Sequence, residues 1–95
     1  MKTLKRVEIR PMFLDGFIPE TQEEGILYIS EKYNCAIHKC LCGCGQDSVT
    51  PLHPSNGWTL TKHEDGRVSL TPSILNNNCP NKSHYILTKN IANFV

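Results

Sequence analysis

Short runs in which apolar and polar residues alternate dominate the chain, and this period of two is typical of β-strands. No window of twelve residues shows the 3.6-residue period of an amphipathic helix. The predicted strands share this alternation or a short apolar run, and they cover residues 3–10, 26–30, 35–39, 48–50, 58–62, 67–71, 84–88 and 91–95. The pattern therefore predicts a mostly β fold.

Turn residues between these runs predict how the strands pair. Asp65-Gly66 lies between two alternating runs, which is the strongest short-range signal for a β-hairpin. Glu31–Asn34 and Lys89-Asn90 separate two further pairs of runs, whereas Pro11 is expected to end the first strand. We expect small antiparallel hairpins around a metal ion, in a zinc-ribbon-like arrangement or a small β-sandwich.

Length and composition set limits on stability and location. The 95 residues predict a single domain over residues 1–95, whose small core provides only limited stability. The absence of an apolar run of about 18–20 residues and of a signal peptide predicts a cytoplasmic protein that does not enter membranes. A net charge of +1 makes nucleic acid an unexpected partner.

Cysteine and histidine are concentrated in two stretches of the chain. Because thiols stay reduced in the cytoplasm, clustered cysteines there are more often metal ligands than disulfides. The candidate ligands are His38, Cys40, Cys42, Cys44, Cys79 and His84. Thiolate and imidazole ligands favour Zn²⁺, which takes four in a tetrahedron, and the sequence leaves open which four bind.

Glycines near the last two thiols support this prediction. Gly43 and Gly45 permit the positive φ and the close backbone approach that a metal-binding turn requires. The spacing C-x-C-x-C differs from the usual C-x-x-C knuckle, so one of Cys40, Cys42 and Cys44 could be surplus. Cys35 is expected to be a small buried residue of a strand, and a redox-active thiol group is the alternative to a metal site.

The sequence contains no catalytic motif that we can assign. The zinc-hydrolase motif H-E-x-x-H is missing, and Ser83-His84 alone does not make a triad. Ser69 and Ser73 are interpreted as hydrogen-bonding turn residues. We therefore predict no catalytic residue and leave the question of enzymatic activity open.

A wider pattern combines the cysteine-rich stretch with other motifs: Gly25-x-Leu27-Tyr28-Ile29-Ser30, His38-x-Cys40-x-Cys42-Gly43-Cys44-Gly45, Thr50-Pro51-Leu52, Trp58, Val68-Ser69-Leu70-x-Pro72-Ser73-Ile74 and Cys79-x4-His84-Tyr85. This pattern resembles a small bacterial and phage-associated zinc-binding family. The family is similar to accessory proteins encoded near bacterial ubiquitin-like conjugation genes. This resemblance implies an E3-like or adaptor-like role in such a pathway.

Two functions follow from the residues and the resemblance together. The first is a zinc-binding adaptor with a structural metal site and a protein partner, such as a component of ubiquitin-like conjugation. The alternative is a zinc- or thiol-dependent hydrolase of the isopeptidase type, which would use an open metal position or a free cysteine.

Overall fold

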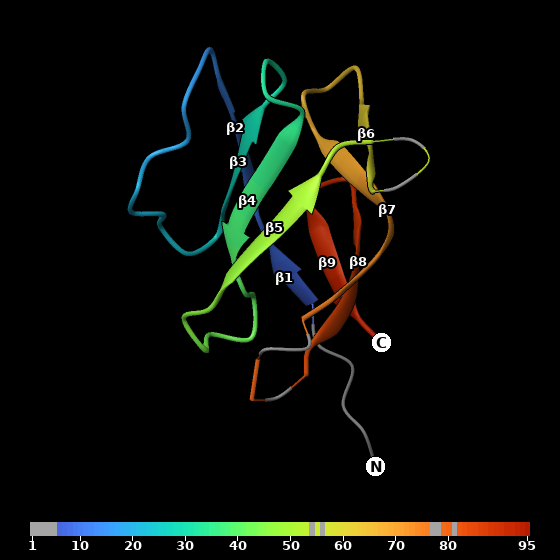
Figure 1. The fold of residues 1–95 in the computed structure, drawn as a ribbon. Coiled ribbons are helices and arrows are strands. Elements are labelled where there is room, and N and C mark those ends of the chain that lie inside the picture. The colour runs from blue at the N-terminus through green and yellow to red at the C-terminus, as the bar shows by residue number, and fades with distance from the viewer. Residues whose placement is uncertain (1–5, 54, 56, 77–78, 81) are drawn as a thin grey trace.

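The computed structural model describes residues 6–53, 55, 57–76, 79–80 and 82–95, and these residues form two packed β-sheets (Figure 1). One sheet has the strand order β1-β9-β8-β7-β6. Its strands are β1 (Arg6–Glu8), β9 (Ile91–Phe94), β8 (His84–Thr88), β7 (Val68–Leu75) and β6 (Thr59–Lys62). The other sheet has the order β2-β3-β4-β5 and contains β2 (Arg10–Leu14), β3 (Ile26–Ser30), β4 (Cys35–Lys39) and β5 (Asp47–Pro51).

Inward-facing side chains of both sheets form the core between them. Alternation is clear in β8, where Tyr85 and Leu87 are buried while Ile86 and Thr88 are exposed. The buried core combines residues from both layers: Ile9, Leu27, Ile29, Ala36, Leu41, Val68, Leu70, Ile74, Tyr85, Leu87 and Ala92. The predicted mostly β fold is confirmed, and of the two expected arrangements the structure has the sandwich.

The predicted hairpins are confirmed. The strand pairs β3–β4, β6–β7 and β8–β9 are all antiparallel. Gly66 has a φ of 89° at the β6–β7 turn, and Lys89 and Asn90 have φ values of 47° and 67° at the β8–β9 turn. The turn residues therefore predicted correctly which consecutive strands pair, because each tight turn needs residues that tolerate positive φ.

The prediction of one first strand over residues 3–10 is wrong in its described part, and residues 3–5 lie outside the described residues. The chain crosses from one sheet to the other at Ile9, which is buried at the crossing point. Pro11 does not end a strand but lies within β2, which pairs in parallel with β3. Because β2 is an edge strand, a proline without an N–H group is tolerated there.

Strand β7 is longer than the run that predicted it. The alternating run ended at Thr71, but β7 continues through Pro72 to Leu75. Its pairing with β8 is irregular between Leu70 and Ile74. Asn76 follows β7 directly, and residues 77–78 lie outside the described residues. None of the described segments forms a helix long and apolar enough to span a membrane.

Candidate functional site

A tight turn after β4 carries the cysteine-rich segment. The N–H of Cys40 donates to the carbonyl of Gln46 over 2.8 Å, and the N–H of Gly43 donates to the carbonyl of Cys40 over 3.1 Å. Gly43 and Gly45 have φ values of 89° and 83°, as the sequence predicted. These two positions let the backbone fold back on itself within a few residues, which brings side chains of the turn close together.

Four cysteines meet at this end of the sandwich. The sulfur atoms of Cys40, Cys42, Cys44 and Cys79 all lie within 4.8 Å of one another. The Sγ atoms of Cys40 and Cys42 are 3.3 Å apart, and those of Cys42 and Cys79 are 3.1 Å apart. Cys40 and Cys79 are buried, whereas Cys42 and Cys44 are half-buried. Cys79 thus returns from the β7–β8 connection to the turn after β4, as expected from the sequence.

This group has the composition and size of a tetrahedral metal site. Zinc–sulfur bonds of about 2.3 Å would place the four sulfurs about 3.8 Å apart, which lies between the observed contact distances and the 4.8 Å limit. A set of four thiols without carboxylates is typical of zinc or iron rather than of calcium or magnesium. The site therefore fits a metal ion held by four thiolates.

The surroundings shift the pKa values of two of the thiols in opposite directions. A hydrogen bond from Ser83, opposed by desolvation and assisted by the neighbouring thiols, lowers the pKa of Cys79 to about 5. For Cys44, a backbone hydrogen bond from Gln46 lowers the pKa, but desolvation and hydrogen bonds to the other thiols outweigh it and raise the pKa to about 12. The arrangement thus already favours one thiolate, and a divalent cation would replace the remaining thiol protons.

Two polar side chains support the sulfur atoms. The Ser83 Oγ lies 3.0 Å from the Cys40 Sγ and 3.2 Å from the Cys79 Sγ. The Asn76 Nδ2 donates to the Cys40 Sγ over 3.3 Å. Donors of this kind stabilise the negative charge of thiolates and fix their orientation.

His38 is not part of the group of four thiols and contacts a tyrosine. Its Nε2 is 2.6 Å from the Tyr85 Oη, which also accepts a hydrogen bond of 3.0 Å from the Asn76 Nδ2. Burial lowers the pKa of His38 to about 4 and raises that of Tyr85 to about 12, so both side chains are neutral near pH 7. The Nδ1 of His38 is buried without a hydrogen-bond partner among the described residues.

His84, the other histidine expected near the metal, pairs with a serine. Its Nε2 lies 2.7 Å from the Oγ of Ser73, and both residues are half-buried. In the described part of the chain, Ser73 is the only side chain that hydrogen-bonds to His84. A serine hydroxyl in contact with an imidazole nitrogen is the arrangement in which histidine removes the hydroxyl proton and serine becomes a nucleophile.

The irregular pairing of β7 with β8 brings Ser73 and His84 together. Leu70 pairs with Leu87 and Ile74 pairs with Tyr85, so four steps along β7 match only two along β8. The two extra residues form a bulge that contains Ser73. Bulges of this kind often re-aim a side chain beside an active site, and here the bulged segment carries the hydroxyl that meets the ring of His84.

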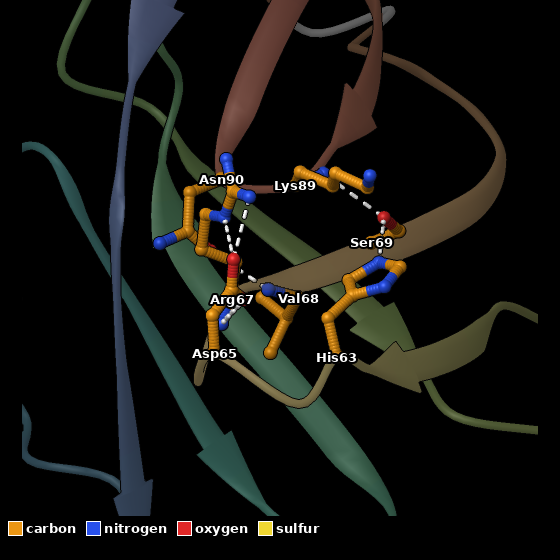
Figure 2. Close-up of polar contacts among 7 residues, drawn as sticks. All are labelled: His63, Asp65, Arg67, Val68, Ser69, Lys89 and Asn90. Atoms are coloured by element: carbon orange, nitrogen blue, oxygen red, sulfur yellow. Dashed lines mark hydrogen bonds and ion pairs between the residues drawn. The ribbon is translucent and has the colours of Figure 1, made fainter.

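A second serine–histidine contact has a structural role. The His63 Nε2 lies 2.8 Å from the Ser69 Oγ, and the same oxygen accepts the backbone N–H of Lys89 over 2.9 Å (Figure 2). Because Lys89 lies in the β8–β9 turn, the Ser69 hydroxyl ties this turn to β7. Its oxygen therefore already has a structural hydrogen bond, whereas the Ser73 hydroxyl contacts His84 among the described residues.

The remaining described serines are less suitable as nucleophiles. Ser30, Ser48 and Ser83 are buried and bind the carbonyl of Gly16, the amide of Asn76 and the cysteine sulfurs, respectively. Ser55 is exposed and lies 3.2 Å from the Nδ1 of His53, which is two residues away in the same loop. Ser73 is thus the serine whose surroundings are best suited to catalysis.

Sequence reasoning missed Ser73 because no local motif contains both partners. Ser73 and His84 are eleven positions apart on neighbouring strands, and only the register shift of β7 joins them. The available signal was the wider pattern, which includes Pro72-Ser73-Ile74 and His84-Tyr85 without assigning them a role.

Comparison with known proteins identifies a family for this chain. No curated protein and no solved structure shows significant similarity to the chain. A family model described as "Bacterial ubiquitination-like system serine protease (BubE)" matches residues 14–95, which include all four clustered cysteines as well as Ser73 and His84. The chain therefore belongs to the BubE family of bacterial ubiquitination-like systems.

Proposed function

We propose that this protein is a cytoplasmic serine peptidase of a bacterial ubiquitination-like system, with Ser73 as nucleophile and His84 as general base. The 2.7 Å contact between the Ser73 Oγ and the His84 Nε2 carries the proposal. The family description as a serine protease supports it, and the surroundings of the other described serines favour Ser73. A substrate in this setting is a ubiquitin-like polypeptide or its conjugate.

The contact supports the usual two-step acyl transfer. The Ser73 Oγ attacks the carbonyl carbon of the substrate while its proton passes to the His84 Nε2. The tetrahedral intermediate collapses, the C–N bond breaks, and His84 gives the proton to the leaving amine. Water then attacks the acyl–serine ester with His84 as base, which releases the carboxylic acid and restores the Ser73 hydroxyl.

The four cysteines are proposed to hold a structural Zn²⁺ close to this pair. Four protein ligands fill a tetrahedron and leave no position for a substrate. This assignment gives His38 and His84 other roles, in the buried network and in catalysis. The metal would fix the β7–β8 connection, because Cys79 and Ser83 both lie within it and His84 follows Ser83 directly.

Substituting the two serines that contact histidines tests the nucleophile. We expect Ser73→Ala to lower hydrolysis of p-nitrophenyl acetate by about a thousandfold or more and to abolish labelling by a fluorophosphonate probe. Ser69→Ala is the matched control, since Ser69 also contacts a histidine but serves a turn. It should keep activity within a few fold. Full labelling of the Ser73→Ala protein would contradict the proposal.

A protein-binding role is the second candidate, and exposed aromatic side chains favour it. Phe17 is 83% exposed and stacks on the ring of Tyr33 at 5.2 Å, and Phe13 and Met12 of the edge strand β2 are also exposed. Exposed apolar groups of this kind mark interaction surfaces. In the Ser73→Ala background, Phe17→Ala should weaken binding to the ubiquitin-like protein of the system in calorimetric titrations. Unchanged affinity would argue against a role for this surface.

A further inference from the structure

Strand β7 has one edge that no described strand covers. Strand β6 pairs with β7 only as far as Thr59 opposite Thr71, so the segment from Ser73 to Leu75 has β8 on one side and no described strand on the other. The N–H of Asn76 donates to the carbonyl of Ser83 on the β8 side over 2.9 Å. Because main-chain groups alternate along a strand, the N–H and C=O of Leu75 face the uncovered side.

Strand β5 presents a similar edge across a groove. Its pairing partner is β4, and the N–H of Leu52 reaches the Asn34 carbonyl on that same side over 2.7 Å. The carbonyl of Pro51 points the other way and accepts the N–H of Trp58. The same alternation turns the main-chain groups of Val49 away from β4. Residues of both edges line an open groove of about 250 Å³, which contains Val49, Trp58, Ile74, Leu75 and Asn76.

Two contacts join the two edges along this groove. At one of them, the Ser48 Oγ donates to the Asn76 Oδ1 over 2.8 Å. At the other, Trp58 binds the carbonyl of Pro51 through its N–H, and its Nε1 lies 3.4 Å from the carbonyl of Ser73. Three steps along β5, from Ser48 to Pro51, span about 10 Å in an extended strand. The part of the groove between these two contacts thus has the length of about three extended residues, and Trp58, which lines the groove, connects it with Ser73.

We propose that this groove is the acyl-side subsite of the peptidase and that it takes an extended segment of the substrate as an added strand along Leu75. The inference rests on the proposed function of Ser73 and His84. An extended, unpaired peptide supplies the donors and acceptors that this main-chain edge needs. The groove is assigned to the acyl part of the substrate, because this part remains attached to Ser73 through both steps and must be held in place. The substrate class is therefore a flexible peptide tail rather than a folded surface loop.

A series of activated esters tests this subsite. The probes are p-nitrophenyl esters of N-acetylated alanine peptides with one to four residues. We expect kcat/KM to rise about tenfold from the shortest to the longest probe, because one or two main-chain hydrogen bonds are gained. Leu75→Pro should remove the rise, since proline lacks the N–H that faces the groove. Leu75→Val keeps the N–H and should keep the rise.

A second measurement does not depend on how Leu75→Pro folds. An N-methylated alanine in the four-residue ester should remove the length effect in the wild-type protein. A rise that survives both Leu75→Pro and N-methylation would overturn the subsite, and so would a wild-type series without any rise. In both cases, hydrolysis that depends on Ser73 would still support the peptidase. If no ester is hydrolysed in a Ser73-dependent way, the proposed function fails and the subsite fails with it.

Discussion

Tyr85 joins two polar side chains, the buried His38 and the half-buried Asn76. Its hydroxyl contacts the His38 Nε2 at 2.6 Å and accepts from the Asn76 Nδ2 at 3.0 Å. Because the oxygen already accepts from Asn76, its proton can go to His38, which then carries its own proton on Nδ1. Tyr85 therefore fixes the orientation of His38, whose neutral form is favoured by burial.

Tyr85→Phe should lower the free energy of unfolding by about 1–3 kcal/mol, because the Nε2 of His38 is then buried without a partner. Urea denaturation measures the effect. Tyr33→Phe is the control, because Tyr33 is 47% exposed and its substitution should change stability by less than about 0.5 kcal/mol. Equal stabilities of the two variants would show that the Tyr85 hydroxyl contributes nothing.

At the scale of single residues, the sequence predicted the grouping of Cys79 with Cys40, Cys42 and Cys44. It did not predict the partners of His38 and His84. Thiol spacing and nearby glycines are local features that a sequence displays directly. The partner of His84 depends on strand register within one sheet, and the partner of His38 depends on how the two sheets pack, and residue types reveal neither. A histidine near a cysteine cluster therefore resembled a ligand in the sequence, although its contacts in the fold are with hydroxyl groups.

Two turns pack together at one end of the five-stranded sheet. The Asn90 Oδ1 in the β8–β9 turn accepts the N–H of Val68, and the N–H of Asn90 donates to the carbonyl of Val68. The Ser69 Oγ accepts the N–H of Lys89 in the same turn (Figure 2). The carbonyl of Asn90 also accepts the N–H of Ile9, at the crossing between the sheets. Asn90 thus connects the hairpin ends with the crossing point.

Asn90→Ala should be more destabilising than Asn90→Gly by about 1 kcal/mol. Both substitutions leave the N–H of the buried Val68 without its acceptor, at a cost of about 1–3 kcal/mol. Only alanine also carries the strain of a φ near 67°, which glycine adopts freely. Chemical denaturation of the two variants gives the difference directly. Equal losses would mean that backbone conformation plays no part at this turn.

The elements that the sequence predicted well are those defined by a turn. Both strands of the β3–β4 hairpin agree with the predicted residues 26–30 and 35–39. The split between β1 and β2 was not predictable in the same way, because alternation shows which residues face one side but not which sheet contains the strand. The extension of β7 past Pro72 was missed because proline usually marks the end of a central strand.

At the scale of the whole molecule, the four thiols connect the two sheets. Cys40, Cys42 and Cys44 follow β4 of the four-stranded sheet, whereas Cys79 lies between β7 and β8 of the other. A metal ion would therefore fasten the layers together at the end of the sandwich that also holds Asn76 and Ser83. In a chain of 95 residues with a small core, such a link should contribute strongly to stability.

Removing the metal should therefore unfold the sandwich and abolish hydrolysis at Ser73 together. We expect elemental analysis to find one Zn²⁺ per chain in the wild-type protein and none in Cys44→Ser, which removes one of the four clustered sulfurs. Cys35→Ser is the control, because Cys35 lies in β4 outside that group and its loss should leave metal content and activity unchanged.

A chelator should broaden or eliminate the cooperative melting transition, since the binding energy of a structural zinc is also folding energy, about 10–16 kcal/mol in finger peptides. A metal-free protein that keeps a sharp transition and its activity would show that the thiols do not hold a structural ion.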